Sequence, residues 1–125
     1  MIKGMEGVSL FSQNPKKLAG FYAKKVGLKK TLEAEMGEGD EIYGFERKGG
    51  TSLYIVSHSK VKGRNKTPER VIINWEVDDL EKEVAKVKKA KVKLVQDIYH
   101  VQDYGYIATF ADVDGNYFQL VKTKA

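Results

Sequence analysis

The feature that most constrains the fold is one order of expected elements that occurs twice along the chain. The first half predicts a strand at 8–12, a helix from Asn14 to Gly27, and strands at 28–36, 42–47 and 51–56, with turns at 37–40 and 48–50. The second half predicts a strand at 71–77, a helix capped by Asp78, and strands at 92–99, 106–111 and 117–122, with a loop at 100–105. Apolar residues alternate in the strands and recur every three to four positions in the helices. Two copies of strand–helix–strand–strand–strand predict an α+β fold.

The two copies are related by an almost constant offset. The expected helix caps, Asn14 and Asp78, lie 64 positions apart, and the segment 53–55 matches 118–120 at an offset of 65. A polar, basic stretch from 57 to 70 has no periodicity and separates the copies. We therefore assign residues 1–58 to a first module, 59–70 to a connector and 71–125 to a second module, within one structural domain.

Both expected helices begin at a capping signal. Asn14 precedes Pro15, which suits the first helical position, and Gly27 suits the end of the helix. Asp78 has Glu81 three residues later, the spacing of a capping box. The apolar positions expected to be buried are Leu18, Phe21, Tyr22, Val26, Leu80, Val84 and Val87.

The run from Phe110 to Val121, FADVDGNYFQLV, predicts two strands joined by a tight turn. Asp and Asn accept backbone N–H groups in such turns, and Gly115 adopts a positive φ without steric cost. The alternative is half of a calcium loop, but an EF-hand needs Glu six residues after its glycine, where this chain has Val121. A hairpin turn is the favoured interpretation.

These residues resemble the C-terminal signature of the vicinal oxygen chelate superfamily, which includes glyoxalase I, extradiol dioxygenases and bleomycin-resistance proteins. The resemblance extends to the first helix through Asn14-Pro15, Phe21-Tyr22 and Gly27-Leu28. It implies two βαβββ repeats that form a cup-shaped mixed sheet with helices on the outer face. Two residues depart from the signature: Val113 replaces proline, and Gln119 replaces the glutamate of metal-binding members.

Alternate residues of a strand face opposite sides of a sheet, so one set of side chains faces the helices and the other lines the concave side. Trp75 falls in the helix-facing, apolar set, which favours a core role. The concave set contains aromatic groups for stacking and amides for hydrogen bonding. From it and the adjacent loop we predict a ligand site formed by Phe11, Tyr54, Asn74, Tyr104, Tyr117 and Gln119.

The resemblance also identifies the positions at which metal-dependent relatives bind their ion. In this chain these positions hold Gly7, Tyr54, Ile72 and Gln119. Glycine and isoleucine offer no donor atom, and a divalent ion needs several convergent nitrogen or oxygen ligands. We therefore predict no metal site and no cofactor.

Two residues are candidates for acid–base catalysis. Glu76 lies in the concave set, and His100 is close in sequence to Asp103 and Tyr104. The alternatives are a salt bridge for Glu76 and a polar surface loop around His100.

Charge and composition restrict the partners. The net charge of +5 spreads over an expected helix face and the connector, where no aromatic residues interleave with the basic ones, so nucleic-acid binding is not expected. No run approaches the length of a membrane span, and no leader-like apolar segment or cysteine is present. We expect a cytoplasmic homodimer.

The leading functional hypothesis is a metal-independent protein that binds an aromatic or hydrophobic ligand in a concave cleft at a dimer interface. The positive net charge favours a neutral or anionic ligand. One alternative is a glyoxalase-like lyase or isomerase that uses Glu76 or His100. A second alternative is a structural or regulatory dimer without small-molecule chemistry.

Overall fold

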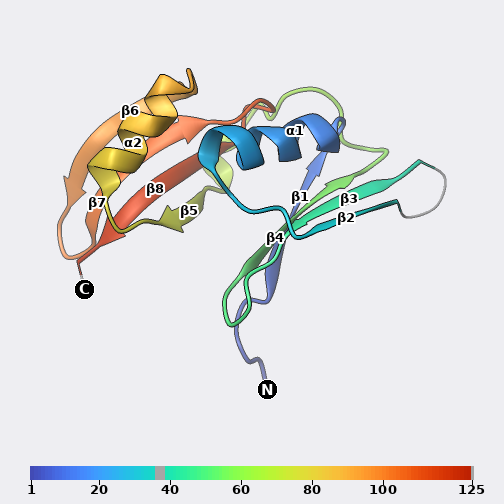
Figure 1. Ribbon diagram of the computed structural model, residues 1–125, viewed down its shortest axis with the longest axis horizontal. Helices are drawn as coiled ribbons and strands as arrows, with labels where there is room; N and C mark the ends of the chain where they lie inside the picture. The colour runs from blue at the N-terminus through green and yellow to red at the C-terminus, as the bar shows by residue number, and fades with distance from the viewer. Residues whose placement is uncertain (36–38, 125) are drawn as a thin grey trace. The chain divides into compact units, whose positions relative to one another are not determined.

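The computed structural model describes residues 1–35 and 39–124 and contains two units with the same order of elements (Figure 1). The first unit, Met1–Gly63, contains β1 (Gly7–Ser12), α1 (Pro15–Phe21), the π-helical turn η1 (Tyr22–Val26), β2 (Leu32–Glu35), β3 (Glu41–Phe45) and β4 (Ser52–Ser57). The second unit, Arg64–Ala125, contains the 3-10 turn η2 (Pro68–Arg70), β5 (Ile73–Glu76), α2 (Leu80–Lys89), β6 (Lys93–Val101), β7 (Gly105–Ala111) and β8 (Tyr117–Thr123). The predicted α+β class and the two βαβββ repeats are confirmed. The connector at 59–70 and the single structural domain stay predictions.

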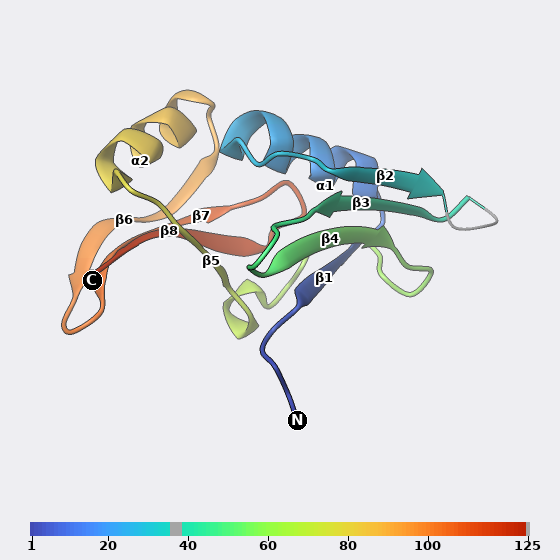
Figure 2. The same cartoon turned by 60° about the horizontal axis from the view of Figure 1, so that its bottom comes forward.

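Each unit has a four-stranded mixed sheet with its own helix on one face (Figures 1 and 2). The strand orders are β1-β4-β3-β2 and β5-β8-β7-β6. The first and last strands of each unit run parallel, and the other neighbours are antiparallel. In each unit the first strand is therefore an edge strand, and the last strand lies inside the sheet.

The strand registers of the two units are related by one offset. Val8 pairs with Leu53 in the first unit, and Ile73 pairs with Phe118 in the second. Each residue of the second pair is 65 positions further along the chain than its counterpart in the first pair. The same offset holds for the antiparallel pairs β3–β4 and β7–β8. Positions 7 and 72, 44 and 109, and 54 and 119 are consequently equivalent.

The first helix begins and ends as its sequence predicts. The Asn14 side chain accepts a hydrogen bond from the Lys17 backbone at 3.2 Å, and Pro15 follows at the first helical position. Gly27 ends the helical segment with φ 93°, in the left-handed region that glycine adopts without steric cost.

The predicted cap of the second helix is wrong by one residue. Asp79, not Asp78, accepts the hydrogen bond from the Lys82 backbone, at 3.1 Å. The apolar stripe explains the shift, because burying Leu80 at the first helical position leaves residue 79 as the cap. Glu81 then lies too close to the cap to complete a capping box. With Asp79 as the cap, the caps of the two helices, residues 14 and 79, are 65 positions apart, which is the offset that relates the strands.

Several strand boundaries differ from the sequence prediction. Of the strand expected at 71–77, only Ile73–Glu76 (β5) is extended, and Val71 is exposed. The strand expected at 28–36 begins at Leu32, while Met36 and much of the turn predicted at 37–40 lie outside the described residues. β6 continues to Val101, so His100 is in a strand and not in the predicted loop.

A tight turn at residues 102–104 explains why β6 extends so far. Asp103 has φ 65°, and Gly105 has φ 140°. A Cβ at Gly105 would lie 2.1 Å from the Lys122 carbonyl oxygen, so only glycine fits where β7 begins. The turn thereby keeps His100 paired with Tyr106.

The predicted alternation of faces holds in the centres of β4 and β8, although Val56 and Val121 of the other face are buried as well. Leu53, Ile55, Phe118 and Leu120 are buried, whereas the intervening Tyr54 and Gln119 are half-buried. Trp75 belongs to the apolar row through its pairing with Leu120 but is only half-buried. No helix in the described part of the chain is long and apolar enough to cross a membrane.

Candidate functional site

The turn between β7 and β8 is organised by one buried carboxylate. The Asp112 Oδ1 accepts backbone N–H groups from Asp114 at 2.9 Å and Asn116 at 3.0 Å, and Oδ2 accepts from the Asn116 amide at 3.0 Å. Gly115 completes the turn with φ 82°. These oxygens face N–H donors, which suits a hairpin turn, as predicted, and not a cation.

The face of the first sheet opposite its helix is dominated by Tyr54. The Tyr54 ring lies between two glycines on neighbouring strands. A Cβ at Gly7 would be 3.1 Å from ring atom Cε2, and a Cβ at Gly44 would be 3.3 Å from Cε1. The ring therefore fills the space above the sheet that side chains at positions 7 and 44 would occupy.

The Tyr54 hydroxyl is within 3.5 Å of a Glu6 carboxylate oxygen and 3.3 Å of a Glu46 carboxylate oxygen. Partial burial, followed by the charges of Glu6 and Glu46, raises the pKa of Tyr54 above its ordinary value. The phenol is therefore neutral near pH 7 and acts as a hydrogen-bond donor.

The residues at the metal-binding positions of the resemblance do not fit a metal ion. Gly7 has no donor atom, and the Tyr54 ring blocks the space in which a longer side chain would lie. Ile72 is apolar, and the Gln119 amide donates to the Thr109 hydroxyl at 3.0 Å. Within residues 1–35 and 39–124, no group of three His, Cys, Asp or Glu side chains is placed to hold a metal.

In the second unit, the four predicted ligand residues lie on the face opposite the helix or contact a residue of that face. Asn74 is paired in register with Gln119, and its amide lies 3.5 Å from the Tyr104 hydroxyl. Tyr117 belongs to the same alternating row of β8 and is half-buried. Asn74, Tyr104 and Gln119 thus form a row of amide and phenol groups, with Thr109 as a member that the sequence analysis missed. The sequence contains a sign of this role, because Thr109 is the polar residue inside the otherwise apolar run 107–111.

The remaining predicted ligand residue, Phe11, lies in the first unit at the edge strand β1. Its side chain is 41% exposed and contacts His58 edge-on, with ring centroids 5.3 Å apart. Phe11 and Tyr54 belong to the first unit, and the other four predicted residues belong to the second.

The two candidate acid–base residues lie on opposite faces of the second sheet. Glu76 pairs with Val121, and its carboxylate accepts a 2.5 Å hydrogen bond from the Thr123 hydroxyl. His100 pairs with Tyr106, which pairs with Lys122 on the other face. The two residues therefore do not act as a pair, and a catalytic role for either stays a prediction.

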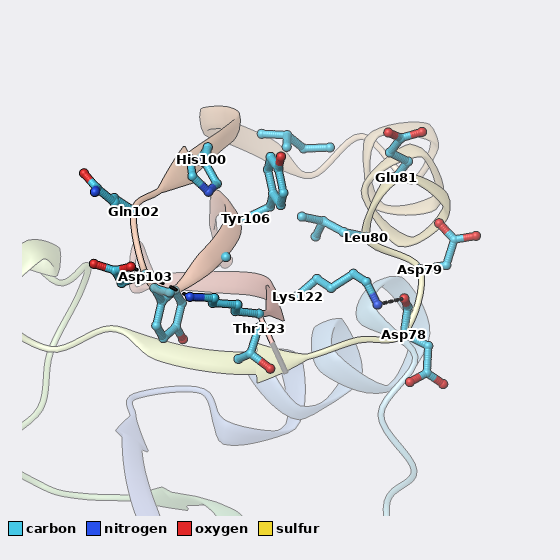
Figure 3. A pocket seen from close by; sticks show the side chains of 14 residues that line it. Asp78, Asp79, Leu80, Glu81, His100, Gln102, Asp103, Tyr106, Lys122 and Thr123 are labelled. Atoms are coloured by element: carbon cyan, nitrogen blue, oxygen red, sulfur yellow. Dashed lines mark hydrogen bonds and ion pairs between the residues drawn. The ribbon is translucent and has the colours of Figure 1, made fainter.

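A pocket of about 950 Å³ opens where α2 begins, beside the β6–β7 hairpin (Figure 3). Leu80 and Ile98 supply apolar surface, and the His100 and Tyr106 rings meet with centroids 4.9 Å apart. The Lys122 ammonium donates to the Asp78 carbonyl oxygen at 2.9 Å. Two of these residues, His100 and Tyr104, were predicted from the sequence as site residues. Tyr106 and Lys122 were not, although strand alternation places both on the face that carries α2.

Most of the chain matches one protein family. The family model for the Glyoxalase/Bleomycin resistance protein/Dioxygenase superfamily covers residues 4–120, so the chain belongs to this superfamily. The fold is that of the vicinal oxygen chelate proteins, as the signature turn predicted. No curated protein matches the sequence.

Three solved structures illustrate the fold similarity. TnmS3, an antibiotic binding protein from Streptomyces sp. CB03234, is 21% identical with a TM-score of 0.78, and 98% of each chain is covered. A glyoxylase/bleomycin resistance protein/dioxygenase domain from Frankia sp. EAN1pec is 15% identical with a TM-score of 0.80, covering 99% of this chain and 100% of that one. The fosfomycin resistance protein FosX from Listeria monocytogenes is 16% identical with a TM-score of 0.73, covering 99% and 96%.

Proposed function

We propose that this protein is a metal-independent binding protein that holds a small aromatic or hydrophobic molecule on the helix-free sheet faces, in a cleft at a homodimer interface. The observation that carries the proposal is the Tyr54 ring, which fills the space above Gly7 and Gly44. An aromatic surface thus takes the place of a metal ligand. Aromatic rings offer a large stacking area with little loss of side-chain entropy.

The polar groups on the same face of the second unit support binding of an uncharged or anionic molecule. Asn74 and Gln119 supply amides, and Tyr104 supplies a phenol. Ligand sites commonly combine apolar surface with a few such oriented polar groups. The net charge of +5 disfavours a cationic ligand. TnmS3, which shares this fold, is named an antibiotic binding protein, and this name supports a small organic molecule as the ligand.

The proposed homodimer is supported by exposed apolar side chains on β6. Leu94, Val95 and Tyr99 are each more than a third exposed on this edge strand. Long apolar edge strands pair with other chains unless they are covered. Sedimentation of the purified protein tests the proposal: a dimer supports it, and a monomer at all concentrations contradicts it.

A cytoplasmic location is proposed because the sequence contains no cysteine.

Ligand binding is tested by a thermal-shift screen with aromatic antibiotics and aromatic metabolites. A ligand at a hundred times its Kd should add about 2.7 kcal/mol to the free energy of unfolding. Asn74→Ala and Tyr104→Phe remove one polar group each and should weaken binding about threefold to tenfold, the worth of one hydrogen bond. Lys82→Ala is the control, because this exposed side chain lies on α2, away from the ligand face and outside the pocket at the start of the helix. No shift with any aromatic compound, or equal losses in all three variants, would contradict the proposal.

A further inference from the structure

We propose a second binding site, on the helix-covered face of the second unit, for a planar aromatic compound that carries a carboxylate. The site is the pocket between the start of α2 and the β6–β7 hairpin (Figure 3). The aromatic ring packs against Tyr106 and His100, and the carboxylate binds the Lys122 ammonium. The site shares Tyr104 with the ligand face of the proposed function, but His100, Tyr106 and Lys122 lie on the other face of the sheet.

Strand alternation separates the two sites. Lys122 pairs with Tyr106, which pairs with His100, so all three side chains lie on the face that carries α2. Tyr104 and Thr123 also line the pocket, and they mark its border with the other face, where Thr123 bonds to Glu76 and the Tyr104 hydroxyl lies 3.5 Å from the Asn74 amide. A compound bound against Tyr106 is therefore separated by the sheet from Asn74 and Gln119.

The pocket offers an aromatic surface that the fold leaves uncovered. Tyr106 is 49% exposed although its ring contacts His100 at a centroid distance of 4.9 Å and an interplanar angle of 47°. Leu80 and Ile98 border the rings. The volume of about 950 Å³ is within the range of small-molecule sites, roughly 300–1,000 Å³. Gly105 fixes the hairpin, so the surface is present before a ligand binds.

The pocket lining carries both signs of charge, with four carboxylates and the ammonium groups of Lys122 and Lys124, so the place of each group decides which ligand charge is accepted beside the rings. The Lys122 ammonium has three donors, and the Asp78 carbonyl oxygen takes one of them at 2.9 Å. Figure 3 shows the carboxylates of Asp78, Asp79 and Glu81 directed away from the ring pair. The Asp103 carboxylate lies 3.8 Å from the Lys124 ammonium. Lys122 is thus the charged group held beside the aromatic surface.

The experiment measures the binding of three matched probes, naphthoate, naphthalenemethanol and naphthylmethylammonium, by titration calorimetry and by NMR. We expect naphthoate to bind most tightly and the ammonium compound most weakly. Tyr106→Ala and Lys122→Met should each weaken naphthoate binding about tenfold, as expected for losing a ring contact or a charged hydrogen bond.

Two matched controls exclude a general effect on the fold. Val71→Ala removes an exposed apolar side chain just before β5, and Lys93→Met removes a lysine at the end of β6 far from His100. Both should change naphthoate binding less than about twofold, since neither residue touches the pocket. Tyr106→Leu keeps an apolar side chain and replaces Tyr106→Ala in the experiment if the alanine variant is unstable.

The outcomes separate this site from the proposed function. The NMR shift changes caused by naphthoate should centre on His100, Tyr106 and Lys122, which identifies this site even if the compound also binds the opposite face. Tighter binding of the ammonium probe, or an equal loss in Val71→Ala and Tyr106→Ala, would overturn the proposed site. Loss of naphthoate binding in Asn74→Ala but not in Tyr106→Ala would overturn it as well, while supporting the ligand face opposite the helix.

Discussion

The Tyr54 ring lies 3.1 Å from the point at which a side chain at Gly7 would begin. Gly7 is on the edge strand β1, and Tyr54 is two residues beyond its register partner on β4. The glycine and the aromatic ring are therefore one packing unit. A change at either position should therefore disturb the packing of the other.

Gly7→Ala should lower the free energy of unfolding by about 1–3 kcal/mol, because the new methyl group meets the ring and the Ser52 carbonyl oxygen. Chemical denaturation measures this loss. Gly20→Ala is the control, since nothing lies within 4 Å of its Cβ and alanine favours a helix, so stability should rise by about 0.5–1 kcal/mol. In a Tyr54→Ala background, Gly7→Ala should cost less. An additive double mutant would contradict the packing unit.

Gly105→Ala should be among the most destabilising single changes in the second unit. The added methyl group would lie 2.1 Å from the Lys122 carbonyl oxygen, and the φ of 140° is unfavourable for alanine. We expect a loss of about 3 kcal/mol or more in the free energy of unfolding. Gly49→Ala also has a positive φ but meets no atom within 4 Å, so its loss of about 1 kcal/mol isolates the backbone effect. Equal losses would show that the contact with Lys122 is unimportant.

Asp112→Ala should cost about 2–3 kcal/mol, because the N–H groups of Asp114 and Asn116 lose a charged acceptor in a buried turn. Asp112→Asn keeps one acceptor oxygen and should cost about half as much. Denaturation curves of the two variants test this order. A smaller loss in the alanine variant would contradict the role of the carboxylate.

Tyr43 should ionise at unusually high pH. Its hydroxyl donates to the Glu41 carboxylate, and this bond, with burial and the charges of Glu41, Glu33 and Glu35, raises the pKa of Tyr43 to about 12. The folded pKa is above the ordinary value of about 10, so the protonated phenol favours the fold. This contribution is complete below about pH 10 and is lost as the pH rises through about 12.

Glu41→Gln should lower the pKa of Tyr43 toward its ordinary value, because the acceptor loses its charge. Ultraviolet titration of phenolate absorbance measures the change, and stability in the variant should depend less on pH in this alkaline window. An unchanged titration curve would show that Glu41 is not the main cause.

Local signals in the sequence predicted much of the fold. Asn14 and Gly27 bracket the first helix as expected, because a side-chain cap and a positive φ depend only on neighbouring residues. The cap of the second helix was ambiguous, since Asp78 and Asp79 are chemically equal and only the burial of Leu80 distinguishes them. His100 was misplaced in a loop because the tight turn that extends β6 depends on a non-glycine residue, Asp103, with positive φ.

The candidate site was less accessible from the sequence. Alternation correctly placed Asn74 and Gln119 on one face, because strand period and pairing fix it. The space-filling role of Tyr54 depends on two glycines from different strands, and no local pattern shows that they flank one ring. The pocket at Tyr106 and Lys122 likewise requires the helix to begin at Leu80, short of the end of the sheet.

The most direct test of the central claim is a metal titration of the chelator-treated protein followed by thermal unfolding. Ni²⁺, Zn²⁺, Mn²⁺ and Fe²⁺ are added separately, and metal content is measured after dialysis. Because Tyr54 blocks the space at Gly7 and Gln119 is a neutral amide bonded to Thr109, we predict no saturable shift and no retained metal. A saturable stabilisation, with one metal ion retained per chain and lost in Gln119→Ala, would contradict metal-independent binding.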